Sequence, residues 1–351
     1  MRWDNLQIAT AEAAGGALPL TLPGAVTRTF TTPGFRGVTC YEIHAKSLLS
    51  KVPAASKVPF RWTVNPYRGC THACTYCFAR NTHTYLDLDS GHDFDSRIIV
   101  KVNAADVLRR ELGARSWQGE AVALGTNTDP YQRAEGRYRL TRGILTVLRD
   151  YANPFSILTK GTLILRDLDL LSDAAQSSWV SVSLSIGFTD QLLWRQVEPG
   201  TPSPQARLGV CRTLVDAGIG CGVLMAPVLP FLTDSDEALE ATVAAIAEAG
   251  ASSVTPLVLH LRPGAREWYL GWLHGSRPEL VPRYEQLYSR GAYAPREYAA
   301  AITAKVAQLA GMYGIGARRP VQHRMPPPPA QTPHAIHEGQ LSLLPNSGDL
   351  L

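Results

Sequence analysis

The stretch GCTHACTYC, from Gly69 to Cys77, contains three cysteines in the spacing Cys-x3-Cys-x2-Cys. Cys70, Cys74 and Cys77 gather three strong metal ligands, and no fourth cysteine follows close by. Clustered thiolates are far more often a metal site than part of an apolar core. The glycine before the motif and the threonines within it favour a loop over a helix. The stretch therefore predicts a metal-binding loop with an incomplete ligand set.

The incomplete set leaves several kinds of site open. A structural zinc ion takes four ligands, and His72 is available as the fourth. An electron-transfer [4Fe–4S] cluster takes four thiolates, but Cys40, Cys211 and Cys221 each stand alone in the chain. Three thiolates on a four-iron cluster leave one iron open to a chelating ligand, as a catalytic metal site requires. A buried stripe of small side chains is the remaining alternative.

Runs of β-forming residues alternate with helical runs along most of the chain. The β-rich runs are 60–64, 121–127, 155–160, 179–186, 222–230 and 253–261. The helical runs between them include 140–152, 203–218 and 235–250. This alternation predicts parallel βαβ units, arranged as a partial (β/α)6 barrel or as an open doubly wound sheet. Ligands of either fold bind beyond the carboxyl ends of the strands, where the cysteine loop falls.

The chain outside the predicted barrel divides into an arm, a helical extension and a tail. Residues 1–55 read as an irregular N-terminal arm, because short Pro- and Gly-containing stretches interrupt them. Residues 56–316 hold the predicted barrel and, from residue 277 onward, further helices. Residues 317–351 begin with a Pro-rich linker, and we expect this tail to be disordered.

Composition narrows the class of protein. The chain has 351 residues, of which 45% are hydrophobic and 18% charged, as is ordinary for a soluble enzyme. The net charge of +4 permits an anionic substrate without requiring one. Six cysteines are too few and too uneven for a disulfide framework. No run approaches the ~20 apolar residues of a membrane span, and the N-terminus lacks the features of a signal peptide. We therefore expect a cytoplasmic protein with no membrane partner.

The segment CTHACTYC has the Cys-x3-Cys-x-aromatic-Cys signature, with Tyr76 as the aromatic, and the chain is identified as a member of the radical S-adenosylmethionine superfamily. This resemblance implies a [4Fe–4S] cluster on Cys70, Cys74 and Cys77, whose open iron chelates S-adenosylmethionine. It implies that an external electron donor reduces the cluster and that the sulfonium C–S bond is then cleaved to a 5′-deoxyadenosyl radical. The protein's part would be to position the cofactor and exclude water.

Over residues 60–265 the chain resembles the branch that includes spore photoproduct lyase and its uncharacterised bacterial relatives. The segments that carry this likeness are YCFAR, GTNTDPYQ, ILTKG, VSLSI, VEPGTPSPQARL and GVLMAPVLP. The resemblance implies that Asn127 contacts the cofactor after the second strand and that Lys160 meets the carboxylate of S-adenosylmethionine. It places Ser185 near the ribose or carboxylate and Ala226 along the adenine. Each residue also has a simpler interpretation, such as Lys160 as a solvated lysine at a strand end.

The chain departs from spore photoproduct lyase at two positions. The lyase has a cysteine as hydrogen donor just before the polar contact of the second strand, where this chain has Gly125. The lyase has a tyrosine directly after the third cluster cysteine, where this chain has Phe78. Neither residue donates a hydrogen atom to a carbon radical, so we expect a different downstream reaction. Glu198 and Arg207 are expected to form a structural ion pair.

The C-terminal segment QLSLL resembles the peptide with which many bacterial repair and replication proteins bind the sliding clamp. It consists of Gln340, Leu341, Ser342, Leu343 and Leu344. An extended peptide on a tether suits capture by an apolar pocket. Together with the branch resemblance, it favours nucleic acid as substrate, in DNA repair or base modification. The alternatives are a small molecule or protein substrate, and a non-catalytic Fe–S or zinc protein for redox sensing or recruitment.

Overall fold

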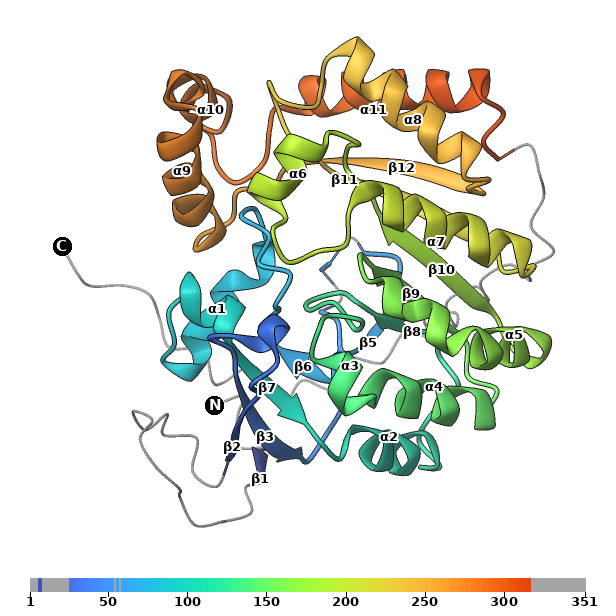
Figure 1. Cartoon of the computed structure of the whole chain (residues 1–351). Coiled ribbons are helices and arrows are strands. Elements are labelled where there is room, and N and C mark those ends of the chain that lie inside the picture. Colours follow the sequence, from blue (N-terminus) through green and yellow to red (C-terminus); the bar gives the residue numbers. More distant parts are fainter. Residues whose placement is uncertain (1–5, 8–24, 54, 57, 317–351) are drawn as a thin grey trace, which may run out of the picture.

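A large, mostly parallel β-sheet runs through the molecule in the computed structural model, which describes residues 6–7, 25–53, 55–56 and 58–316 (Figure 1). Its strands lie in the order β12-β11-β10-β9-β8-β5-β4. They are β4 (Leu49–Lys51), β5 (Trp62–Val64), β8 (Val122–Leu124), β9 (Phe155–Thr159), β10 (Val180–Ser185), β11 (Cys221–Val228) and β12 (Ser253–Val258). All of them pair in parallel except β4, which is antiparallel to β5. Each predicted β-rich run overlaps one parallel strand, so the partial (β/α)6 barrel is confirmed.

Helices cover one face of this sheet in chain order (Figure 1). They are α2 (Ala104–Leu112), α4 (Leu140–Asp150), α5 (Leu168–Ser177), α7 (Pro204–Asp216) and α8 (Asp236–Glu248). Ser203 and Ser235 begin α7 and α8, because each hydroxyl accepts a hydrogen bond from a backbone N–H of the first turn at 3.2 Å. Leucine, isoleucine and valine side chains of these helices and of the sheet form the main core. The predicted helical runs at 140–152, 203–218 and 235–250 are therefore confirmed.

A second, smaller sheet contains part of the N-terminal arm. Its strands are β1 (Leu6–Gln7), β2 (Val26–Thr29), β3 (Thr39–Ala45), β6 (Tyr67–Arg68) and β7 (Arg97–Lys101). Strands β1, β2 and β3 of this sheet and β4 of the large sheet all lie within residues 1–55, so the expectation of an irregular arm there needs correction. Tyr41 and Ile43 of β3 pack against Ile99 of β7, its parallel partner. Their partner lies more than fifty residues away in the chain, so local sequence gives little sign of the strand.

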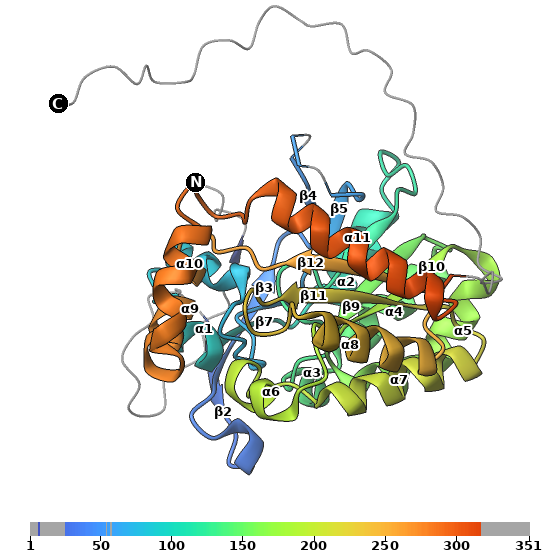
Figure 2. The same ribbon diagram turned by 90° about the horizontal axis from the view of Figure 1, so that it is seen from above.

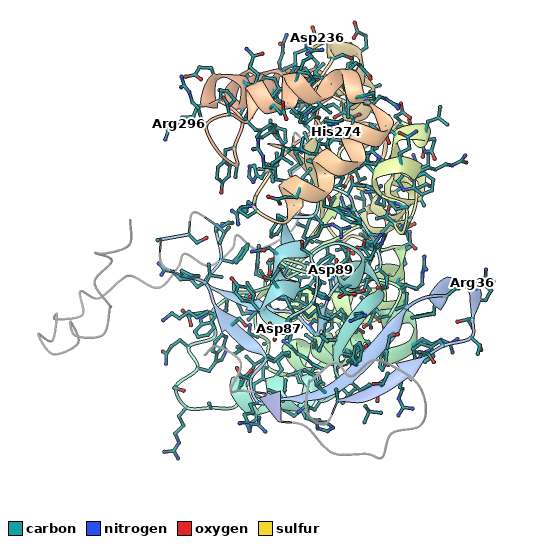
Figure 3. The ribbon with its side chains drawn as sticks, turned by 90° about the vertical axis from the view of Figure 1, so that its left-hand side faces the viewer. Arg36, Asp87, Asp89, Asp236, His274 and Arg296 are labelled. Carbon is teal, nitrogen blue, oxygen red and sulfur yellow. The ribbon has the colours of Figure 1, made fainter. Side chains whose placement is uncertain are left out.

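The remaining helices lie in the connections between strands or after β12. They are η1 (Pro33–Phe35), η2 (Phe78–Leu86), α1 (His92–Ser96), α3 (Glu135–Tyr138), η3 (Thr162–Asp167), α6 (Gln191–Val197), α9 (Ala265–Ser276), η4 (Pro278–Leu280), α10 (Val281–Leu287) and α11 (Arg296–Met312). Helix α11 packs along β12 and α8 (Figure 2). In the side view, the turn with Asp87 and Asp89 after η2 lies between α9, marked by His274, and the N-terminal sheet (Figure 3). The C-terminal helices therefore reach the segment that follows the cysteine loop.

The Pro-rich linker and the tail with Gln340–Leu344 lie outside the described residues. No helix in the described part of the chain is long and apolar enough to cross a membrane. The divisions at residues 55 and 316 stay predictions.

We expect Leu184→Ala to lower the free energy of unfolding by about 2–5 kcal/mol, because it removes a fully buried side chain from β10, an interior strand of the large sheet. Urea unfolding followed by circular dichroism measures this change. Leu192→Ala is the matched control, since that leucine is 71% exposed on α6 and its loss should change the free energy by no more than about 0.5 kcal/mol. Equal losses in both variants would contradict the assigned core.

Candidate functional site

A cavity opens at the carboxyl ends of the parallel strands. Its empty space, including volume open to solvent, is about 900 Å³. The side chains that the sequence singles out all line it: Cys70, Cys74, Tyr76, Cys77, Asn127, Lys160, Ser185 and Ala226. They come from the cysteine loop and from the ends of β8, β9, β10 and β11. The structure therefore brings the predicted site residues together, while their individual roles stay predictions.

The cysteine loop is irregular, as predicted, and hydrogen bonds fix its start. Gly69 has a φ of +81°, which a residue with a side chain rarely adopts. The backbone N–H of Cys70 donates to the carbonyl of Phe94 at 2.9 Å. The amide of Gln132 accepts from the backbone N–H of Thr71 at 3.0 Å and donates to the carbonyl of Gly69 at 3.0 Å. Gln132 thus holds the loop by two backbone groups.

A buried arginine holds the middle of the loop. Arg80 is fully buried, and its guanidinium donates to the carbonyl of Cys74 at 3.0 Å and 3.2 Å. The same group pairs with Asp95 at 2.9 Å and lies 4.8 Å from the ring centre of Trp268. Since the guanidinium has donors in several directions, it joins the loop to α1 and α9 at once.

The end of α6 and the turn after it pack closely against the cysteine loop. The backbone N–H of Gly200 donates to the carbonyl of His72 at 3.0 Å, and that of Thr75 donates to the carbonyl of Val197 at 2.9 Å. A Cβ atom at Gly200 would lie 2.0 Å from the carbonyl oxygen of Thr71. Only glycine lets the two backbones approach this closely.

The three thiols form a donor set that suits an iron–sulfur cluster. Burial raises the pKa of Cys70, Cys74 and Cys77, and Lys160 partly offsets this effect for Cys74. Metal binding must therefore release protons from these thiols. In the described part of the chain, no three His, Cys, Asp or Glu side chains converge on one point that suits a single metal ion. The thiols instead line a shared cavity, and soft thiolates are the ligands that iron–sulfur clusters take.

The carboxylate of Glu198 connects the cavity wall to the protein interior. It is fully buried and accepts hydrogen bonds from the hydroxyl of Tyr76 and the guanidinium of Arg207. The ammonium of Lys160 lies 3.2 Å from Oε1, the oxygen that also accepts from Tyr76, whereas Arg207 donates to Oε2. Burial alone would raise the pKa of Glu198, but the charges of Arg207 and Lys160 outweigh it and lower the pKa to about 2. The expected Glu198–Arg207 ion pair is present, and it extends to two predicted cofactor contacts.

Lys160 is a cavity residue, with a side chain only 12% exposed. Its ammonium donates to the hydroxyl of Ser185 at 2.6 Å and to the carbonyl of Ala226 at 3.3 Å. It also lies 5.7 Å from the ring centre of Tyr76. The alternative of a solvated strand-end lysine is therefore wrong, because the side chain turns inward onto β10 and β11.

Sequence reasoning missed Asp129, which fixes the backbone beside Lys160. Its carboxylate accepts from the backbone N–H of Lys160 at 2.6 Å, the hydroxyl of Thr159 at 2.6 Å and the backbone N–H of Tyr131 at 2.8 Å. It lies 3.4 Å from Nδ1 of His72. Burial alone would raise its pKa, but His72 and these hydrogen bonds lower it. An Asp-Pro pair after a strand is a turn signal that could have indicated this residue.

The structure shows the surroundings of the two positions at which the chain departs from spore photoproduct lyase. Gly125 has a φ of +83°, and a Cβ atom there would lie 1.8 Å from the carbonyl oxygen of Leu158. The neighbouring strand thus leaves no room for a cysteine at this position. Phe78 stands at the cavity mouth and is 49% exposed.

Comparison with known proteins identifies the family. The model of the radical SAM superfamily matches residues 64–243. The chain belongs to the radical SAM superfamily. An uncharacterised protein of Mycobacterium tuberculosis is 50% identical to this radical SAM protein over 330 residues, which are 93% of this chain and 96% of the relative. An uncharacterised protein of Methanocaldococcus jannaschii is 31% identical over 195 residues, which are 55% of this chain and 69% of the relative.

The fold of this radical SAM protein is that of spore photoproduct lyase. The lyase complexed with dinucleoside spore photoproduct superposes with a TM-score of 0.60 and 16% identity, covering 88% of this chain and 86% of the lyase. This agrees with the branch that the sequence indicates. The protein is a radical SAM enzyme, and the cofactors of its superfamily are a [4Fe–4S] cluster and S-adenosylmethionine.

We expect Gly200→Ala to displace the cysteine loop, because the new methyl group meets the carbonyl of Thr71. The variant should lose about 1–3 kcal/mol of stability and most of the iron that wild type takes up in anaerobic reconstitution. Gly209→Ala in α7 is the matched control, since beyond the adjacent residues and backbone of its own helix no atom lies within 4 Å of the added methyl group. That change should stabilise the helix by about 0.5–1 kcal/mol and leave iron uptake unchanged. Normal iron content in Gly200→Ala would refute the assigned contact.

We expect Glu198→Gln to destabilise the protein by about 3–5 kcal/mol at pH 7, because it leaves two buried cations without their counter-charge. The pKa of Glu198 falls from an ordinary 4.5 to about 2 on folding, so its contribution is full above 4.5 and is lost as the pH falls toward 2. Urea unfolding curves of wild type and variant should therefore approach each other between pH 5 and pH 3.

The exposed Glu285→Gln on α10 serves as the control for this series and should follow wild type at every pH. A constant difference between wild type and Glu198→Gln across the range would mean that the Glu198 charge does not stabilise the fold.

Proposed function

We propose that this enzyme generates a 5′-deoxyadenosyl radical in the cavity and uses it on nucleic acid, in DNA repair or base modification. One observation supports radical generation in the cavity: the three cysteines share a single cavity with Lys160 and Ser185 at the strand carboxyl ends. Active sites of barrel enzymes lie at this face. When bound there, the cluster and S-adenosylmethionine supply the radical that abstracts hydrogen from the substrate.

In this proposal Cys70, Cys74 and Cys77 are the cluster ligands. Asn127, Lys160, Ser185 and Ala226 contact S-adenosylmethionine, and Tyr76 closes the wall between loop and lysine. Leu158, Leu224 and Leu259 line the cavity beside the polar groups, and these apolar side chains exclude water from their part of the wall. A shielded wall protects a reactive radical from side reactions.

The charge balance supports Lys160 as the carboxylate contact. Lys160 and Arg207 contribute two positive charges, and Glu198 contributes one negative charge. Burial and the Glu198 charge raise the pKa of Tyr76 well above its ordinary value, so that its hydroxyl stays neutral. This network therefore keeps one net positive charge, and Lys160 presents it at the cavity wall. A carboxylate placed there gains a charge-assisted hydrogen bond.

The choice of nucleic acid rests on the branch resemblance and on the sequence of the tail. The solved lyase with this fold is described as complexed with dinucleoside spore photoproduct. The relay of that lyase has no counterpart at Gly125 and Phe78, so the reaction proposed here is not spore photoproduct cleavage by that route. Gln340–Leu344 would dock on the sliding clamp, and an external donor would reduce the cluster. A small molecule or a protein is the competing substrate class.

The test is anaerobic reconstitution with iron and sulfide, reduction with dithionite and quantification of 5′-deoxyadenosine. Wild type should form it, and Cys74→Ala should form none because one cluster ligand is lost. Cys40→Ala is the control, since that cysteine is buried in the smaller sheet away from the cavity. Addition of ultraviolet-damaged DNA should increase the yield from wild type. No 5′-deoxyadenosine despite intact cluster absorbance would contradict radical generation, and no response to DNA would favour the other substrate class.

A further inference from the structure

We propose that Phe78, Arg262 and Tyr293 form a stacking site for one nucleobase at the mouth of the cavity. This inference rests on the proposed function, because it locates where a nucleic acid would meet the enzyme. The three residues come from separate segments: η2 after the cysteine loop, the β12–α9 connection and the α10–α11 connection. We call them the mouth triad.

The mouth triad places a guanidinium near two exposed rings. Phe78 is 49% exposed and Tyr293 is 53% exposed. The guanidinium carbon of Arg262 lies 5.8 Å from the ring centre of Phe78 and 5.9 Å from that of Tyr293. Arg262 also donates a hydrogen bond to the hydroxyl of Tyr293 at 2.9 Å. The arginine therefore holds a fixed position relative to the tyrosine instead of extending freely into solvent.

His260 connects the mouth triad to the cavity itself. It lines the cavity, forms an antiparallel bridge with Tyr293 and packs edge-on against that ring, with the ring centres 4.6 Å apart. Burial and the charge of Arg262 lower the pKa of His260, so the imidazole is neutral near pH 7. Phe78 lines the cavity on the side of the cysteine loop. A planar group that stacks on these rings would lie across the entrance of the cavity.

The chemistry of the mouth triad fits a nucleotide. Exposed aromatic rings gain free energy by stacking on a flat π-system, and nucleobases offer such a face whatever their sequence. A guanidinium stacks on bases as well and attracts the adjacent phosphate. A nucleotide combines a planar group and a negative charge in one unit, whereas an aromatic peptide residue has the plane without the charge. Since Phe78 directly follows Cys77, a base bound there would also be adjacent to the cysteine loop.

The test is the affinity of the full-length protein for a short fluorescein-labelled oligothymidylate, measured by fluorescence anisotropy under anaerobic conditions without a reductant. Phe78→Ala and Tyr293→Ala should each weaken binding roughly 5- to 150-fold, as loss of one stacked base predicts. Phe78→Trp should retain binding, because it keeps an aromatic plane, whereas Phe78→Leu should weaken it. Circular dichroism establishes that each variant is folded.

Tyr151→Ala is the matched control, since that tyrosine is 41% exposed at the end of α4 and does not line the cavity. It should bind the oligothymidylate as wild type does. Wild-type affinity in both Phe78→Ala and Tyr293→Ala would overturn the mouth triad while leaving a nucleic acid substrate in place. Absence of binding by a wild type that still forms 5′-deoxyadenosine would overturn both the triad and the substrate class, but not radical generation. Stronger competition by a tryptophan-containing peptide than by unlabelled oligothymidylate would assign the mouth to a protein substrate.

Discussion

The buried carboxylate of Glu198 is the interaction on which the site depends. A carboxylate without water must have cationic and hydrogen-bonding partners, or it would destabilise the fold. Its partners Tyr76, Lys160 and Arg207 come from the cysteine loop, the end of β9 and helix α7. Satisfying this one charge therefore fixes three segments relative to each other. The same interaction leaves Lys160 directed at the cavity, so that a structural role and the proposed cofactor-binding role meet in one network.

Close backbone contacts also hold the cysteine loop in place. The cysteine loop lies between the turn at Gly200, the amide of Gln132 and the guanidinium of Arg80. Each contact holds backbone atoms and leaves the cysteine side chains to face the cavity. A loop held in this way keeps its thiols preorganised, which lowers the cost of assembling a multi-iron group on them. The loop thus behaves as part of the scaffold.

The inner part of the cavity, which we call its floor, differs from the mouth in the residues that line it. The floor has the three cysteines and the Lys160 network, which we propose bind the cluster and S-adenosylmethionine. The mouth has exposed rings and Arg262, and it includes Phe78 at one of the positions where the chain departs from spore photoproduct lyase. At the other departure, the approach of β9 excludes any side chain at Gly125. Both departures therefore lie at the lining of the same cavity as the three cysteines.

The sequence by itself determined the parts of this protein that depend on neighbouring residues. Spacing within a few residues identified the cysteine loop, and short periodic patterns identified the parallel strands and their helices. Only the tertiary structure showed strands β2 to β4, the anchors Gln132 and Asp129, and the link from Glu198 to Tyr76 and Lys160. β2 and β4 pair with the next strand along the chain, but the other contacts join residues tens of positions apart. Apart from the Asp-Pro turn signal at Asp129, no local pattern marks these distant contacts. Burial decides which polar groups must be paired, and burial exists only after the chain has folded.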